Sequence, residues 1–131
     1  MHTDEHRLNQ LTELVIGCAY RVSNKLGSGF LEKVYENAMA VELQRAGIFF
    51  EQQKSIVVRY DGVVVGDYVA DLLIEGVVLV ELKACKGLDE IHEAQCLNYL
   101  KATRLPLCLL INLGKSRVEI KRFAGQAARL S

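Results

Sequence analysis

The chain has 131 residues, 50% of them hydrophobic, and its 16 Lys and Arg residues balance 16 Asp and Glu residues. A chain of this length can bury roughly two-thirds of its unfolded surface, so we expect a single domain spanning residues 1–131 with a core of its own. Zero net charge excludes a strongly basic nucleic-acid-binding coat and an acidic disordered tail, so that any site for a polyanion must be local.

Two amphipathic helices are predicted at the start of the chain. From about Asp4 to Leu26, apolar residues recur at three- and four-residue steps, which indicates a helix with one apolar face. Gly27-Ser28-Gly29 ends this helix. A second apolar series from Leu31 to Leu43 predicts another helix, which stops at Ala46-Gly47 because glycine readily adopts the left-handed conformation at a helix end.

After the second helix the composition changes to β-branched and aromatic residues, which favour strands. We expect strand segments joined by turns at Asp61-Gly62 and Glu75-Gly76. The segments are residues 48–50, 55–60, 63–65, 68–74 and 77–84. The last segment is apolar except at Glu81 and Lys83, which is typical of a central strand covered by helices on both faces.

The rest of the chain predicts one more helix and two more strands. Residues 88–103 form the helix, with Asp89 and Glu90 in a first turn where the helix dipole favours acids. Strands at 107–111 and 117–123 follow. The order is roughly ααβββ(β)αββ, which indicates an α/β domain with a mixed β-sheet flanked by helices.

The sequence indicates neither a membrane-spanning segment nor disulfide bonds. No apolar stretch reaches the roughly 18 to 20 residues needed to cross a bilayer, and the first ten residues are polar, so we expect a cytoplasmic protein without membrane contact. The cysteines lie far apart in apolar segments and form no CxxC pair, which favours buried or half-buried free thiols. They are Cys18, Cys85, Cys96 and Cys108.

Three charged residues lie inside apolar strand segments, where burial is costly without a partner. They are Asp71, Glu81 and Lys83. Residues two apart on a strand face the same side, so Glu81 and Lys83 project together, and a neighbouring strand can bring Asp71 beside them.

The length of the loop between these strands decides whether the two carboxylates meet. A two-residue loop at Glu75-Gly76 would put Asp71 opposite Val80 and leave Glu81 on the other face. A three-residue loop, Glu75-Gly76-Val77, or a bulge at Gly76 brings Asp71 opposite Glu81. We predict the second arrangement.

Two carboxylates, with a backbone carbonyl and waters, suit Mg²⁺ or Mn²⁺, which polarise a phosphoryl oxygen and activate water. Lys83 would add a positive charge near the reacting phosphate. The alternative is a structural one, an internal salt bridge of Lys83 with Glu81 or Asp71.

The D-x9-ExK pattern across a hairpin resembles the PD-(D/E)XK nuclease superfamily, and the surrounding sequence is similar to its small GxxExxY family. The matching blocks are GFLEKVY at 29–35, ADLLIE at 70–75, VELKA at 80–84, HEAQCLNYL at 92–100, LLINLG at 109–114 and VEIKRF at 118–123. The resemblance covers a core of about residues 11–123. It implies a restriction-endonuclease-like fold and Mg²⁺- or Mn²⁺-dependent phosphodiester hydrolysis in DNA or RNA.

Carried over to this sequence, the resemblance makes Asp71 and Glu81 the metal ligands and Lys83 the catalytic lysine. It makes Glu32 a helix-borne acid that sits near the metal or orients a ligand water. Gln95 and Tyr99 match a Q-x3-Y helix that supports the active site or contacts the nucleic-acid strand.

His92 falls on the same side of its predicted helix as Gln95 and Tyr99. It is therefore a candidate for reaching a scissile phosphate, and the alternative is that it packs on the sheet. At the level of the whole protein, the rival to a nuclease is a non-catalytic nucleic-acid-binding or protein-assembly module on the same fold. The choice between DNA and RNA, and activity as a homodimer or within a larger complex, stay open.

Overall fold

The computed structural model describes residues 5–125, and in this part of the chain it forms three helices and five strands. The helices are α1 (Glu5–Leu26), α2 (Glu32–Arg45) and α3 (Glu90–Thr103). The strands are β1 (Phe50–Tyr60), β2 (Val63–Ile74), β3 (Val78–Lys83), β4 (Leu107–Asn112) and β5 (Glu119–Ala124). The predicted α/β class with helices around a mixed sheet is confirmed.

The five strands form one sheet whose strand order follows chain order, so β3 is central. β3 and β4 are parallel, and the other neighbouring pairs are antiparallel. α3 provides the crossover between the two parallel strands, which a tight turn could not join. Every residue of β4 is buried, as expected of a strand covered by helices on both faces.

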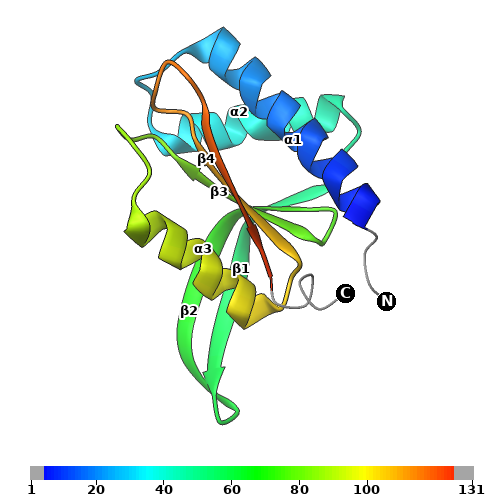
Figure 1. Cartoon of the computed structure of the whole chain (residues 1–131), viewed down its shortest axis with the longest axis vertical. Coiled ribbons are helices and arrows are strands. Elements are labelled where there is room, and N and C mark those ends of the chain that lie inside the picture. The colour runs from blue at the N-terminus through cyan, green and yellow to red at the C-terminus, as the bar shows by residue number, and fades with distance from the viewer. Residues whose placement is uncertain (1–4, 126–131) are drawn as a thin grey trace.

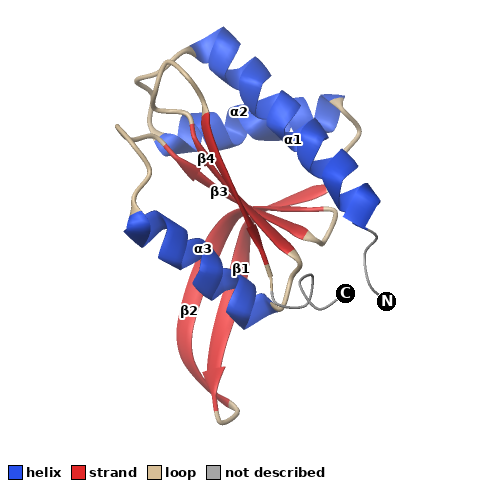
Figure 2. Ribbon diagram, viewed as in Figure 1, coloured by secondary structure: helices blue, strands red, loops and turns tan. Residues whose placement is uncertain are grey.

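Helices cover both faces of the sheet (Figure 2). α1 and α2 pack on one face, where they meet Val78, Val80 and Leu82 of β3. α3 packs on the other face, in a cluster that contains Leu79. Because alternate residues of a strand point to opposite faces, Glu81 is directed to the α3 side of the sheet.

β1 and β2 continue beyond the other strands as a two-stranded ribbon (Figure 1). β3 pairs with β2 only from Leu72 to Ile74, whereas β1 pairs along nearly the whole of β2. The two residues of the ribbon's turn, Asp61 and Gly62, have φ values of 49° and 80°. Positive φ at both positions is the geometry of a type I′ hairpin turn, which favours these residue types.

The structure joins strand segments that the sequence separated. Segments 63–65 and 68–74 form one strand, β2, because Gly66 and Asp67 between them remain paired with β1. Segments 48–50 and 55–60 likewise become the single strand β1. Turn-forming residues inside a long hairpin are therefore held extended by the partner strand.

The third helix begins at Glu90, two residues later than expected, because the side chain of Asp89 caps it by accepting from two backbone N–H groups. Asp4, the expected start of the first helix, lies outside the described residues. None of the helices in residues 5–125 is long and apolar enough to cross a membrane. The cysteines are free thiols, as predicted; Cys18, Cys96 and Cys108 are buried and Cys85 is half-buried.

Candidate active site

The loop between β2 and β3 has three residues. Ile74 pairs with Val78 and Leu72 pairs with Val80, so residues 75–77 lie outside the ladder. The predicted register is thus confirmed, and continuing it by one position brings Asp71 to the level of Glu81.

The two carboxyl groups are connected to each other's strand. Oε1 of Glu81 accepts a hydrogen bond from the backbone nitrogen of Asp71 at 3.0 Å. Oδ2 of Asp71 accepts from the backbone nitrogen of Leu82 at 2.8 Å. Each carboxylate therefore bonds a backbone donor of the facing strand, and the second oxygen of each carboxyl group is left for other partners.

β2 is irregular at Asp71. Ala70 packs in the cluster beside α3 and Leu72 in the cluster beside α1 and α2, although residues two apart on a strand normally share a face. The pairing with β1 also skips Asp71, because Gln53, the residue that faces it, has a left-handed φ of 54°. The ribbon therefore diverges from the central sheet at the position of the two carboxyl groups.

Burial raises the pKa of both carboxyl groups. Glu81 is only 3% exposed, and burial together with the charge of Asp71 raises its pKa to about 8. Burial also raises the pKa of Asp71, against the lowering effect of the hydrogen bond from Leu82. Glu81 is buried and Asp71 is half-buried, and two such carboxyl groups that repel each other favour the binding of a proton or a cation between them.

Lys83 lies half-buried at the end of β3, and its positive charge opposes the raised pKa values of Asp71 and Glu81. None of the ion pairs within 4.0 Å in residues 5–125 includes Lys83. The salt bridge expected by the structural alternative is therefore not formed. Its ammonium group remains near the carboxylates without being neutralised by direct contact.

α2 brings two further acids towards this site. The exposed Glu32 and the buried Glu36 both act on Asp71 by charge repulsion. Glu36, only 3% exposed, accepts hydrogen bonds from Gln52 Nε2 and Gln53 Nε2, each at 2.7 Å. This carboxylate thereby ties α2 to the irregular part of β1. This role of Glu36 was not predicted from the sequence, where its only sign was the four-residue spacing from Glu32, which puts the two acids on one helix face.

α3 contributes a tyrosine and a glutamine. Gln95 Nε2 donates to the hydroxyl oxygen of Tyr99 at 2.9 Å, which the four-residue spacing allows. Burial raises the pKa of Tyr99 to about 12, and the charge of Glu81 is the next cause. Tyr99 of the Q-x3-Y pair thus lies close enough to Glu81 and Asp71 for their charges to raise its pKa.

His92 caps α3. Its Nδ1 accepts a hydrogen bond from the backbone nitrogen of Asp89 at 3.3 Å, while Oδ1 of Asp89 accepts from the backbone nitrogen of His92 at 3.1 Å. This is a reciprocal capping box. The structure therefore shows a helix-capping role for His92.

A buried amide fixes the chain that follows Lys83. Asn112 is fully buried; its Oδ1 accepts from the backbone nitrogens of Cys85 and Gly114, and its Nδ2 donates to the Cys85 carbonyl and Glu119. A Cβ at Gly114 would lie 2.4 Å from the Cys85 nitrogen, so the two loops pack too closely for a side chain. This network was not predicted from the sequence, where its only sign was one polar residue, Asn112, at the end of an apolar strand segment.

A protein-family comparison decides which fold family this site belongs to. Residues 9–123 match the family model of the PD-(D/E)XK nuclease superfamily. The chain belongs to this superfamily. The match spans the ribbon, the central strands and all of α3, so it includes every residue of the candidate site.

Two solved structures share the fold of this PD-(D/E)XK chain. The crystal structure of SSO0001 has a TM-score of 0.58 and 21% sequence identity, over 89% of this chain and 58% of that chain. An alkaline exonuclease (LHK-Exo) from Laribacter hongkongensis has a TM-score of 0.53 and 14% identity, over 99% of this chain and 75% of the exonuclease. This chain thus spans less than two-thirds of the SSO0001 chain. The comparison with curated proteins gave no significant match.

PD-(D/E)XK nucleases generally use divalent metal ions. In residues 5–125 no three His, Cys, Asp or Glu side chains come together as a metal site. Mg²⁺, however, keeps several waters and is commonly held by only one or two carboxylates. Asp71 and Glu81 supply two adjacent carboxyl groups whose repulsion a cation would relieve, so this donor set fits such an ion.

Proposed function

We propose that this PD-(D/E)XK protein is a member of the GxxExxY family and a Mg²⁺- or Mn²⁺-dependent nuclease that hydrolyses phosphodiester bonds in DNA or RNA. In this proposal Asp71 and Glu81 hold the ion, which would polarise the phosphate and activate water. The protein acts in the cytoplasm.

The observation that supports this function best is the close pair formed by the half-buried Asp71 and the buried Glu81, beside a lysine that has no ion pair in the described part of the chain. A purely structural cluster would gain most from a close salt bridge, because a buried charge without a partner is costly. Lys83 forms no ion pair within residues 5–125, and the pKa of Glu81 is raised to about 8. The arrangement therefore suits the binding of a cation by the carboxyl groups and of a substrate phosphate by Lys83.

Each residue has a distinct role in the proposal. The ammonium group of Lys83 stabilises charge that develops on the phosphate oxygens. Glu32, exposed at the start of α2, orients water near the ion. The Gln95–Tyr99 pair positions the strand, while His92 acts by holding the first turn of α3 in place.

The test is hydrolysis of single- and double-stranded DNA and RNA by the purified protein with Mg²⁺ or Mn²⁺, beside Mn²⁺ titration by calorimetry. We expect cleavage that requires the ion, and Mn²⁺ binding that Asp71→Asn and Glu81→Gln each weaken strongly. Glu13→Gln, at an exposed position of α1, is the matched control and should change neither.

Absence of cleavage together with Mn²⁺ binding that is unchanged in both site variants would contradict the nuclease proposal. It would favour the binding or assembly module as the role of this fold. Light scattering of the same samples measures whether the active species is a monomer, a homodimer or a larger complex.

A further inference from the structure

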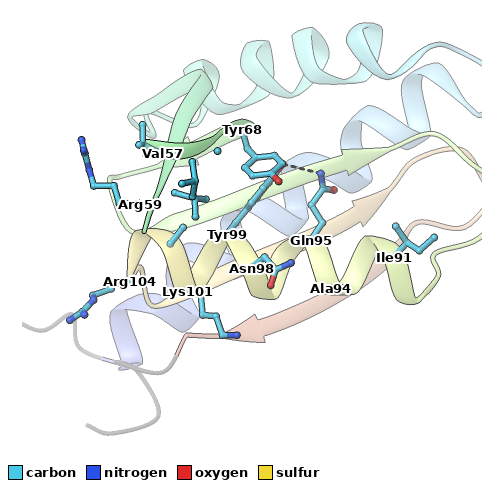
Figure 3. Close-up of a pocket in the computed structure, with 14 residues that line it drawn as sticks. Val57, Arg59, Tyr68, Ile91, Ala94, Gln95, Asn98, Tyr99, Lys101 and Arg104 are labelled. Carbon is cyan, nitrogen blue, oxygen red and sulfur yellow. Dashed lines mark hydrogen bonds between the residues drawn. The ribbon is translucent and has the colours of Figure 1, made fainter. Parts of the chain in front are cut away.

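A groove of about 1090 Å³ runs between the β1–β2 ribbon and α3 (Figure 3). It is separate from the carboxyl groups: neither Asp71 nor Glu81 lines it, but Gln95 and Tyr99 do. Tyr68 lines the groove three residues before Asp71 on β2. Three residues of extended strand span about 10 Å, so the groove ends close to the candidate active site.

The charge of the groove is one-sided. Its charged lining residues are Arg59, Lys101 and Arg104, and no Asp or Glu lines it. Within residues 5–125 none of these three cations takes part in an ion pair. In a chain of zero net charge, this is a local concentration of positive charge beside an acidic site.

Three cations near the C-terminus differ in this respect, namely Lys115, Lys121 and Arg122. Lys121 is paired with Glu93, Lys115 lies 3.8 Å from Glu119, and Arg122 donates to Asn9 at 2.7 Å. Those cations are already used within the protein. The groove cations are therefore the better candidates for contacts with an external anion.

The groove also offers an aromatic surface. Tyr68 is 51% exposed, and its ring centroid lies 5.9 Å from that of Tyr99, which supports it from below. Val57, Val65 and the exposed Ile91 add apolar walls. Cations that follow a backbone, combined with an aromatic face on which bases stack, are the features of single-strand binding sites.

We propose that this groove binds a single-stranded polynucleotide and directs it to the Asp71–Glu81 site, an inference that rests on the proposed nuclease function. Arg59, Lys101 and Arg104 contact the phosphates, and one base stacks on Tyr68. A duplex is disfavoured because its bases are stacked on one another and cannot reach the ring of Tyr68.

The test uses the full chain with Asp71→Asn and Glu81→Gln, in EDTA, so that neither cleavage nor metal contributes to binding. Affinity for labelled DNA and RNA single strands of about 10 nucleotides, and for the matching duplexes, is measured by fluorescence anisotropy over a range of salt concentrations. We expect the single strands to bind at least about tenfold more tightly than the duplexes. The comparison of DNA with RNA decides which sugar the groove accepts.

Charge reversal tests the phosphate contacts. In this background Arg59→Glu with Lys101→Glu should reduce the slope of log affinity against log salt by about 1.4, because each phosphate contact on a single strand contributes about 0.7. Arg7→Glu with Arg117→Glu makes the same change of charge at exposed positions outside the groove and should leave the slope nearly unchanged.

Removal of the ring tests stacking. Tyr68→Ala should weaken single-strand binding about tenfold, while Tyr68→Phe retains most of it because the ring remains. Tyr60→Ala is the control, since Tyr60 is 70% exposed at the ribbon's turn and does not line the groove.

Three results would overturn the groove proposal: tighter binding of duplexes, equal effects of the two charge reversals, or unchanged affinity in Tyr68→Ala. A separate cleavage assay with wild-type protein and Mn²⁺ distinguishes this failure from failure of the nuclease proposal. Binding that depends on the groove overturns only the nuclease function if wild type does not cleave and Mn²⁺ binding is unchanged in Asp71→Asn and Glu81→Gln. Cleavage that the groove variants leave unchanged overturns only the proposal that the groove binds the strand.

Discussion

The backbone nitrogen of Asp71 donates a hydrogen bond to the carboxylate of Glu81, 3.0 Å away on the neighbouring strand. The carboxylate of Asp71 returns a similar contact by accepting from the nitrogen of Leu82 at 2.8 Å. At the point where β2 and β3 stop pairing, side-chain oxygens thus take the place of backbone carbonyls. Each carboxyl group therefore has a structural hydrogen bond beside the chemical role that we propose for it, and substitutions can separate the two.

Asp71→Asn and Asp71→Ala are expected to differ in stability but not in activity. Asparagine keeps an oxygen that can accept from Leu82, whereas alanine leaves a buried N–H group unsatisfied at a cost of about 1–3 kcal/mol. Both remove the negative charge, so both should reduce hydrolysis by at least about 100-fold, or about 2.7 kcal/mol in the barrier. Urea unfolding and a cleavage assay make the comparison, and an Asp71→Asn protein that cleaves like wild type would contradict it.

Because the pKa of Glu81 is raised, we expect the free energy of unfolding of the metal-free protein to fall between pH 4.5 and 8. The ordinary pKa of a glutamate is 4.5 and that of Glu81 in the folded chain is about 8, so the folded state holds a proton that the unfolded state has lost. The stabilising contribution is complete below pH 4.5 and disappears as the pH rises through 8. Within this window the free energy of unfolding should fall by up to about 1.4 kcal/mol per pH unit.

Glu81→Gln should flatten that dependence, because glutamine carries no proton to lose and can still accept from Asp71. Urea unfolding in EDTA at several pH values checks this, with Glu13→Gln as the control for loss of an exposed acid. Equal pH slopes for wild type and Glu81→Gln would show that Glu81 does not titrate in this range.

Lys83→Met should abolish hydrolysis while leaving the melting temperature nearly unchanged. Lys83 forms no ion pair within 4.0 Å in the described part of the chain, so its loss breaks no close contact with a carboxylate. A buried ion-pair network would instead lose about 3–5 kcal/mol when one partner is removed. Calorimetry with the cleavage assay distinguishes these outcomes, and Lys83→Arg controls for the charge.

Asn112→Leu should destabilise the fold by at least about 2 kcal/mol. The substitution leaves the backbone nitrogens of Cys85 and Gly114 without their acceptor and fills the site with an apolar side chain. Because Cys85 lies two residues after Lys83, we also expect a lower rate in whatever fraction remains folded. A melting curve and a rate normalised to folded protein measure both effects; Leu97→Ala, at a partly exposed position of α3, is the control for general sensitivity.

Much of the site was predictable because it depends on local chemistry. Asp71, Glu81 and Lys83 were predicted as site residues because charged side chains inside apolar strand segments need a partner. The Glu75-Gly76 turn, where both residues have positive φ, indicated a loop that sets the register. The capping role of His92 also had a local signal, an Asp three residues earlier.

Other features depended on elements far apart in the chain. The break in pairing at Asp71 arises where Gln53 of β1 turns away to bond Glu36 of α2, and no spacing within one segment encodes that contact. Asn112 is recognisable only when β4 lies beside the chain that follows Lys83.

The sequence by itself determined the order of the elements, predicted the hairpin register that the structure confirms, and pointed to Asp71 and Glu81, because periodicity and turn geometry act over a few residues. Only the tertiary structure decided that Lys83 has no ion pair in the described part of the chain, that Glu36 is buried, and that cations from β1, α3 and the residue that ends α3 line one groove. Those properties depend on distances between side chains on separate elements, which packing fixes and local sequence does not.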